Sequence, residues 1–146
     1  MDIIIDTIIV FILAIWELWV SIPIGLGFGL NPILIIIVSS LGSISSAITI
    51  AYFGESIRNW IIKRKSRKKD IKEGRAYDIW NKYGTVGLGL LSPLLFGAPV
   101  GAAIGIALGI PKKDLINWMS IGIVIWSITL TTIGNFGINI FQQTII

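Results

Sequence analysis

The chain has 146 residues, of which 54% are hydrophobic and only 14% are charged, and its formal net charge is +4. A soluble domain of this size cannot bury such long apolar runs, so the composition predicts an all-α integral membrane protein. Cysteine and histidine are both absent, which excludes disulfides, thiolate chemistry, His-based acid–base catalysis and the usual zinc sites. We therefore expect no enzyme, no metal site and no cofactor.

The first apolar stretch runs from Ile3 to Leu30. Glu17 lies inside it, with no basic residue near it in the sequence. Because an intramembrane carboxyl group is costly, it is a functional-site candidate by default, and we expect Glu17 to bind a proton. Asp6 is nearer the terminus, and we expect it at the membrane interface.

The next segment, Pro32–Phe53, carries no charge and would span about 33 Å as a helix, which suits one crossing of a bilayer. Small residues along it predict the close approach of another helix: Gly42, Ser45, Ser46 and Ala47.

The linker that follows, residues 55–82, is charged but carries isoleucine and tryptophan at intervals, which is typical of amphipathic helices on a membrane surface. All twelve basic residues of the chain lie between Arg58 and Lys113. The positive-inside rule places such a segment in the cytoplasm, where membrane lipids rather than nucleic acid are the expected partners. The residues expected to contact lipid headgroups are Lys63, Arg64, Lys65, Arg67, Lys68 and Lys69.

The second half, residues 83–146, repeats the order of the first half, residues 1–54. The apolar stretch Gly84–Ile110 is again interrupted by proline and glycine, and Pro111 opens a second predicted crossing that ends near Gly134. The residues after Asn135 are predicted to form a mixed polar and apolar tail.

Prolines and glycines recur at matching places in these two halves. Pro23, Gly25 and Gly29 are followed, 76 residues later, by Pro99, Gly101 and Gly105, and farther along Gly42 meets Gly122 and Gly54 meets Gly134. Such paired interruptions point to the central site of a transporter, and Pro23 and Pro99 are predicted to break their helices and expose amides that hold an anionic headgroup. The candidate residues of the substrate pathway or proton site are Glu17, Pro23, Gly25, Gly29, Asn31, Ser92, Pro93, Pro99, Gly101 and Gly105.

Two topologies are compatible with this pattern. In a plain four-helix protein Ile3–Ser21 and Gly84–Ile110 are full crossings, which places Lys112 and Lys113 outside, against the charge rule. In the other topology, which we favour, the chain is an inverted repeat of two units, each a re-entrant helical hairpin plus one transmembrane helix, and every basic residue is cytoplasmic. Two hairpins that meet tip to tip would keep their non-helical backbone packed against protein.

The sequence Glu17-Leu18 followed by Ile22-Pro23-Ile24-Gly25 resembles the small multidrug export protein family, as does Lys82-Tyr83-Gly84 followed by Gly87-Leu88-Gly89-Leu90. That family looks like a branch of the DedA superfamily, whose members are thought to pair re-entrant hairpins with transmembrane helices. The family's arginine after Glu-Leu is Trp19 here, and its usual Pro-Leu-Pro-Gly-Thr-Gly stretch is replaced by residues 93–99. DedA proteins often also have an arginine near the second hairpin, and none occurs between Lys82 and Lys112 here. These departures put in doubt the proton-coupled or phosphate-directed transport that relies on those arginines.

The resemblance implies a small plasma-membrane transporter that moves lipid-like or amphiphilic substrates, including anionic ones, with Glu17 as the proton-sensitive group. Two alternatives stay open, a small multidrug exporter and a non-transporting scaffold that recruits a partner through its basic loop. A chain with only two crossings and two hairpins is too small to seal a pathway alone, so we expect a homodimer or a higher oligomer.

Overall fold

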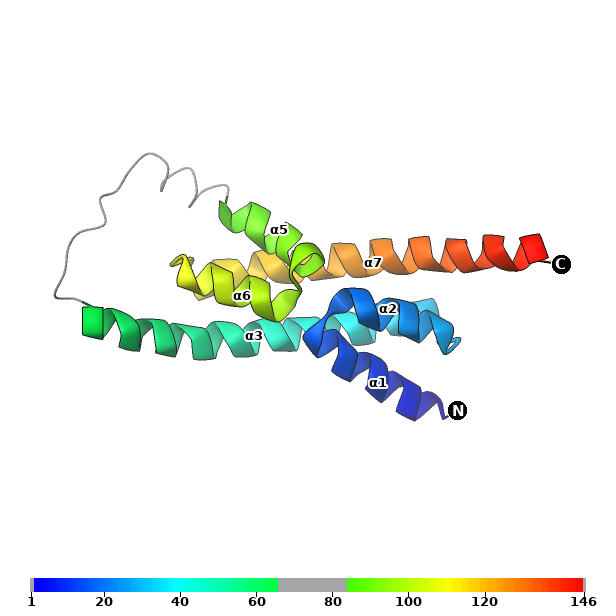
Figure 1. Ribbon diagram of the computed structural model, residues 1–146, viewed down its shortest axis with the longest axis horizontal. Helices are drawn as coiled ribbons and strands as arrows, with labels where there is room; N and C mark the ends of the chain where they lie inside the picture. Colours follow the sequence, from blue (N-terminus) through cyan, green and yellow to red (C-terminus); the bar gives the residue numbers. More distant parts are fainter. Residues whose placement is uncertain (1, 66–83, 146) are drawn as a thin grey trace.

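The computed structural model describes residues 2–65 and 84–145, and within these ranges it contains helices and no strand, which confirms the predicted all-α class. The helices are α1 (Ile3–Trp16), α2 (Leu18–Gly27), α3 (Pro32–Lys65), α5 (Thr85–Leu95), α6 (Ala98–Ala107) and α7 (Lys112–Ile145), as Figure 1 shows. Residues 66–82 of the predicted linker lie outside the described residues.

The two long helices, α3 and α7, are apolar enough to cross a bilayer. Their apolar spans are Pro32–Ser56, with 25 residues, and Lys112–Ile140, with 29 residues. Both helices continue beyond the ends predicted at Phe53 and Gly134, so the predicted C-terminal tail is helical instead. The extensions contain no proline, and lysine, arginine and glutamine are good helix formers, so nothing in the sequence stops either helix where the hydropathy falls.

The four shorter helices form two hairpins at opposite ends of the α3–α7 pair. The two long helices run antiparallel and pack along each other (Figure 1). Helices α1 and α2 lie at the end that holds both termini, and α5 and α6 lie at the other end (Figure 1). The hairpins reach each other near the middle, where α1 contacts α6 and α2 contacts α5.

Large apolar side chains are exposed on the outer faces of these helices. Ile3 and Ile33 are each 68% exposed, and Ile133 is 63% exposed. Exposed apolar surface of this extent is unusual on a soluble monomer but is the normal outer surface of a protein in lipid.

The two units repeat the same backbone hydrogen bonds 80 residues apart. After α2 the amides of residues 28–30 donate to the carbonyls of residues 24–26, and after α6 the amides of residues 108–110 donate to those of residues 104–106. Gly29 and Gly109 supply the left-handed φ angles of 72° and 87° in these turns. The predicted offset of 76 at the breaks is therefore wrong, because Gly25 is equivalent to Gly105. The predicted offset of 80 along the long helices holds.

The buried side chains form two clusters, and each cluster draws on both units. The cluster around α6 includes Ala47 and Ala51 of α3 as well as residues of α7. The cluster around α1 and α2 is covered by Trp126 and Leu130 of α7. The second helix of each hairpin therefore packs on the long helix of the other unit.

Glycines let the first helix of each hairpin approach the backbone of its own long helix. A Cβ atom at Gly42 would lie 2.8 Å from the carbonyl oxygen of Phe11 and 2.9 Å from the Cβ of Ala14. A Cβ atom at Gly122 would lie 2.6 Å from the carbonyl oxygen of Gly89. The close approach predicted at Gly42 is thus confirmed, and Gly122 is its equivalent in the second unit.

Candidate functional site

The two hairpin tips touch at Glu17 and Gly97. Glu17 links α1 to α2 in an extended conformation, with φ −152° and ψ 121°, and its amide donates a 2.7 Å hydrogen bond to the carbonyl of Leu13. Gly97 links α5 to α6 with φ 79° and ψ 162°, a conformation open mainly to glycine. A Cβ atom at Gly97 would lie 3.3 Å from the carbonyl oxygen of Trp16 and 4.0 Å from Cγ of Glu17. Glu17 and Gly97 are equivalent positions of the two units, 80 residues apart.

A groove with a volume of about 650 Å³, which we call the tip groove, opens beside this contact. It is walled by the ends of α1 and α5, by the middle of α3 and by α6. Its lining residues are Ile15, Trp16, Glu17, Ser45, Ser46, Thr49, Ile50, Phe96, Pro99, Val100, Ala103 and Ile104. Of the candidates predicted from the sequence, Glu17 and Pro99 meet here.

Hydroxyl groups form the polar part of the α3 wall. The hydroxyl of Ser45 donates to the carbonyl of Leu41 at 2.7 Å, and the hydroxyl of Thr49 donates to the carbonyl of Ser45 at 2.8 Å. The sequence predictions used Ser45 and Ser46 only as a helix-packing stripe and missed Thr49. The signal for Ser45 and Thr49 was weak, because they lie one turn apart but residues 39–49 of the same helix carry four other serines, Ser39, Ser40, Ser43 and Ser46.

A second and smaller groove, of about 330 Å³, lies between α2 and α7. Pro23 lines it together with Trp19, Leu130 and Ile133, and none of its lining residues carries a charge. Pro23 and Pro99 thus belong to different grooves.

The prediction that Pro23 breaks its helix is wrong, because Pro23 lies inside α2 and the chain reverses at Glu17 instead. Burial of Leu18 and Ile22 holds α2 together across the one hydrogen bond that the proline removes. Pro99 lies in the first turn of α6, where a missing amide costs little.

Four predicted candidates, Gly25, Gly29, Asn31 and Gly105, have structural roles in the loops and close contacts of the hairpins. A Cβ atom at Gly25 would lie 3.0 Å from the side chain of Ile35, and one at Gly105 would lie 2.5 Å from that of Leu115. The side-chain oxygen of Asn31 accepts a 2.9 Å hydrogen bond from the amide of Ile33 and so caps α3. Gly29 is exposed and provides the left-handed turn described above.

Three further candidates, Ser92, Pro93 and Gly101, lie where α5 packs on α6 rather than in the tip groove. Ser92 and Pro93 are both buried, and a Cβ atom at Gly101 would lie 2.5 Å from Cβ of Ser92. The hydroxyl of Ser92 has no hydrogen-bond partner among the described residues.

Asp6, in the first turn of α1, is buried, and its position at the membrane interface stays a prediction. Its side chain is only 3% exposed, and one carboxyl oxygen has no hydrogen-bond partner among the described residues. Helix α1, which carries Asp6, packs on α3 and α2.

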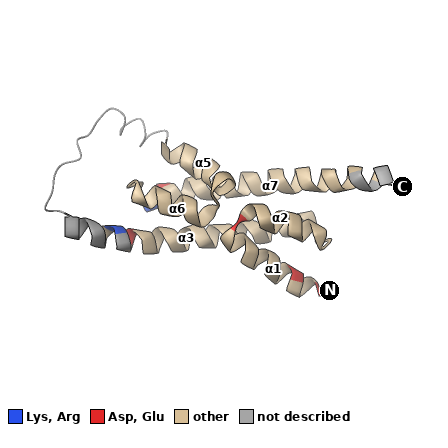
Figure 2. Ribbon diagram, viewed as in Figure 1, with Lys and Arg blue, Asp and Glu red and all other residues tan. Residues whose placement is uncertain are grey.

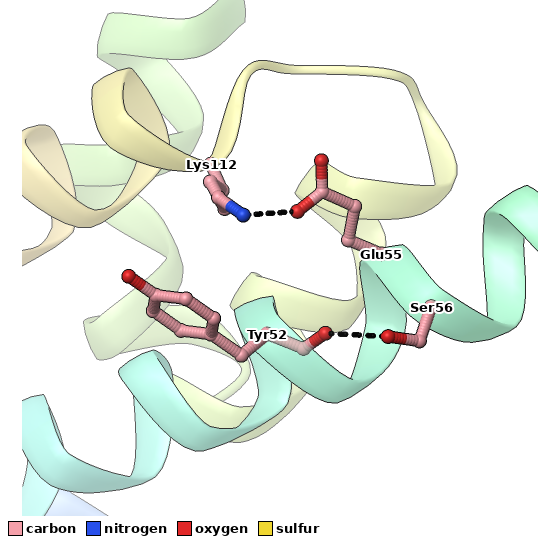
Figure 3. Close-up of polar contacts among 4 residues, drawn as sticks. All are labelled: Tyr52, Glu55, Ser56 and Lys112. Atoms are coloured by element: carbon pink, nitrogen blue, oxygen red, sulfur yellow. Dashed lines mark hydrogen bonds and ion pairs between the residues drawn. The ribbon is translucent and has the colours of Figure 1, made fainter.

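The described basic residues lie on the part of the molecule opposite the termini, toward the end of α3 and at the start of α7 (Figure 2). Nζ of Lys112 lies 2.6 Å from a carboxylate oxygen of Glu55 and 4.7 Å from the centre of the Tyr52 ring, which ties the start of α7 to α3 (Figure 3). Of the predicted headgroup contacts, Lys63, Arg64 and Lys65 end α3, and their side chains are outside the described set. Arg67, Lys68 and Lys69 lie outside the described residues altogether.

A sequence model of the family described as "Putative small multi-drug export protein" matches residues 17–129, which is well over half of the chain. The match begins at Glu17 and covers both hairpin tips and the tip groove apart from Ile15 and Trp16. No curated protein and no solved structure matches the chain.

Proposed function

The chain belongs to the small multi-drug export protein family, and from this premise we propose that it exports amphiphilic molecules through the tip groove. The observation that carries the proposal is the position of Glu17, the acidic residue in the lining of a groove where two hairpins meet. A volume of about 650 Å³ is within the range of small-molecule sites, which is roughly 300–1,000 Å³. Acidic residues that face a cavity inside a membrane protein usually mark a substrate or proton pathway.

We propose that the hairpins are re-entrant and that the two units form an inverted repeat. The longest hairpin helix, α1, has 14 residues and spans about 21 Å, whereas the hydrocarbon core of a bilayer is about 30 Å thick. Only α3 and α7 among the described helices are long enough to cross. Their antiparallel course, with one hairpin at each end, is the arrangement that an inverted repeat requires.

We propose that the chain lies in the plasma membrane and that the end carrying Arg58, Lys112 and Lys113 faces the cytoplasm. The opposite end, which holds both termini, has no basic residue among the described residues. This distribution follows the positive-inside rule. Labelling a cysteine introduced as Lys112→Cys from outside intact cells would contradict this orientation.

The DedA resemblance extends the proposed substrates to lipid-like amphiphiles. The tip groove supports this extension because exposed Trp16 and Phe96 line it, so a molecule could enter from the side without first passing through water. Proton exchange at Glu17 would supply the coupling. We also propose a homo-oligomer, because two crossings alone enclose little space.

Flux measurements in proteoliposomes test the function. The wild type should release an entrapped fluorescent amphiphile or move a labelled lipid between leaflets faster than empty liposomes do. Glu17→Gln should reduce the flux to that background, and Pro99→Ala should alter it. Asp114→Asn, which removes an exposed carboxylate at the start of α7, is the matched control and should retain flux. Wild-type flux in Glu17→Gln would remove the basis of the proposal. If wild type moves neither probe, the scaffold interpretation gains support instead.

A further inference from the structure

We propose that the tip groove binds a protonated amine with an apolar, planar body, and that it prefers this amine to a quaternary ammonium ion and to an anion. This inference names the substrate class of the proposed exporter and so rests on the proposed function. It depends on three properties of the groove: its net charge, its hydrogen-bonding groups and its aromatic rings.

The charge of the groove is that of Glu17 alone. None of the residues that line the groove is basic, and Lys112 is paired with Glu55 beyond it. Helix dipoles add little, because at each tip the end of one helix adjoins the start of the next. The negative end of α1 offsets the positive end of α2, and the negative end of α5 offsets that of α6. The site is therefore electrostatically complementary to a cation and opposed to an anion.

Two of the three hydroxyl groups on the α3 wall leave only hydrogen-bond acceptors for a ligand, whereas Ser46 and the indole N–H of Trp16 can also donate. A hydroxyl has one proton and two lone pairs, and Ser45 and Thr49 each commit that proton to a backbone carbonyl. Their oxygens can then only accept. An ionised Glu17 also only accepts, and Pro99 has no amide proton to donate. A ligand with N–H donors satisfies these groups, whereas a quaternary ammonium ion cannot.

Aromatic rings complete the lining. Trp16 is 79% exposed and Phe96 is 53% exposed, and both are among the residues that line the groove. Ring faces attract cations and pack against planar apolar bodies. Because this attraction acts on ammonium and quaternary ions alike, the preference between the two must come from the acceptors.

Binding to purified protein in lipid nanodiscs tests the inference with three probes that share one ring system: naphthylmethylammonium, naphthylmethyl-trimethylammonium and naphthylacetate. We expect the ammonium ion to bind about tenfold or more tightly than the quaternary ion, and naphthylacetate to bind least. Glu17→Gln should weaken binding of the ammonium ion about 10-fold to 100-fold, since charged hydrogen bonds are the stronger ones. Asp114→Asn should leave it unchanged.

A second variant keeps the inference testable if Glu17→Gln does not fold. Thr49→Val removes one acceptor at nearly constant shape and should weaken binding of the ammonium ion roughly 2-fold to 10-fold, with no effect on the quaternary ion. Thr129→Val is its matched control, because Thr129 makes the same local bond, to the carbonyl of Ile125 at 2.8 Å, away from the groove.

Three results would overturn the inference: equal binding of the ammonium and quaternary ions, tighter binding of naphthylacetate, or binding of no probe. Selective binding without flux in proteoliposomes would refute the proposed transport and leave the ligand class standing. Flux without selectivity among the probes would refute the inferred ligand class and leave the proposed transport standing.

Discussion

Replacing Gly122 by alanine should loosen the contact between α5 and α7, because the added methyl group would meet backbone rather than a movable side chain. The new Cβ atom would lie 2.6 Å from the carbonyl oxygen of Gly89, 2.9 Å from Cα of Leu90 and 3.0 Å from its carbonyl oxygen. Overpacking of this kind typically costs about 1–3 kcal/mol. Alanine is also the better helix former, by up to about 1 kcal/mol, which partly offsets the clash.

Gly137→Ala in the same helix is the matched control, because no atom lies within 4 Å of the Cβ that it would add. Both variants gain the same helix propensity, so the difference between them isolates the contact. We expect Gly122→Ala to be less stable than Gly137→Ala by about 1–3 kcal/mol. The assay is unfolding of the purified protein in mixed micelles of a mild detergent and dodecyl sulfate, followed by far-ultraviolet circular dichroism.

A hydrogen bond at the same contact between α5 and α7 allows a second test of the prediction. The indole N–H of Trp126 donates to the carbonyl of Leu90 at 2.8 Å. Trp126→Phe should cost about 1 kcal/mol or more, and the double variant Gly122→Ala/Trp126→Phe should cost less than the sum, since pushing Leu90 away already weakens this bond. Equal stability of Gly122→Ala and Gly137→Ala, or strict additivity in the double variant, would refute the reasoning.

Three further predictions use the same unfolding assay. Ser43→Ala should lower the free energy of unfolding by about 1 kcal/mol, because the buried hydroxyl of Ser43 donates to the carbonyl of Ala14 at 2.7 Å. Ser45→Ala should have little effect, because the hydrogen bond of Ser45 is local and exposed. Equal losses of stability in the two variants would contradict this. Gly29→Ala should cost about 1–2 kcal/mol, since φ is 72° there, while Gly27→Ala, with helical φ and open space, should cost nothing; a stable Gly29→Ala would show that the turn rearranges. Lys112→Glu should lower the unfolding midpoint by placing two acids together, and adding Glu55→Lys should restore it; a double variant as weak as the single one would show that the ion pair does not join α3 to α7.

The sequence was sufficient to predict the helical class and the two helices that are apolar enough to cross a bilayer, with their starting points to within one residue. Long apolar runs have few alternatives to a membrane helix, and Pro32 and Pro111 mark helix beginnings by their chemistry. Gly42 and Gly122 were paired correctly, because close packing along a long helix requires a small residue at a fixed place.

The register of the breaks was predicted wrongly, because the match of prolines at an offset of 76 was preferred to the match of glycines at 80. Proline is the expected breaking residue, but the fold tolerates Pro23 inside α2 and reverses at Glu17, because the burial of Leu18 and Ile22 outweighs one missing hydrogen bond. The turns at Gly29 and Gly109 set the equivalence of the halves. The sequence carries this register as well, because glycines recur 80 residues apart: Gly25 and Gly105, Gly29 and Gly109, Gly42 and Gly122, and Gly54 and Gly134.

The candidate site was only partly predictable for a related reason. Glu17 could be identified from the sequence because it is an acidic residue in an apolar segment, and Pro99 also lines the tip groove. Thr49 and Phe96 entered the site because α3 crosses the hairpin tips, and such a long-range contact has no local signature. Gly25 and Gly105 are packing residues, and a glycine at a close helix contact cannot be told from a glycine at a binding site by its sequence alone.

The exchange of partners between the two units has a consequence for the order in which the chain is made. Helix α2 is covered on one side by Trp126 and Leu130 of α7, which are synthesised about a hundred residues later. When only the first hairpin and α3 have been synthesised, the side of α2 that packs on α7 is therefore not yet covered by that helix. Both clusters are completed only once α7, which contributes residues to each of them, has been synthesised.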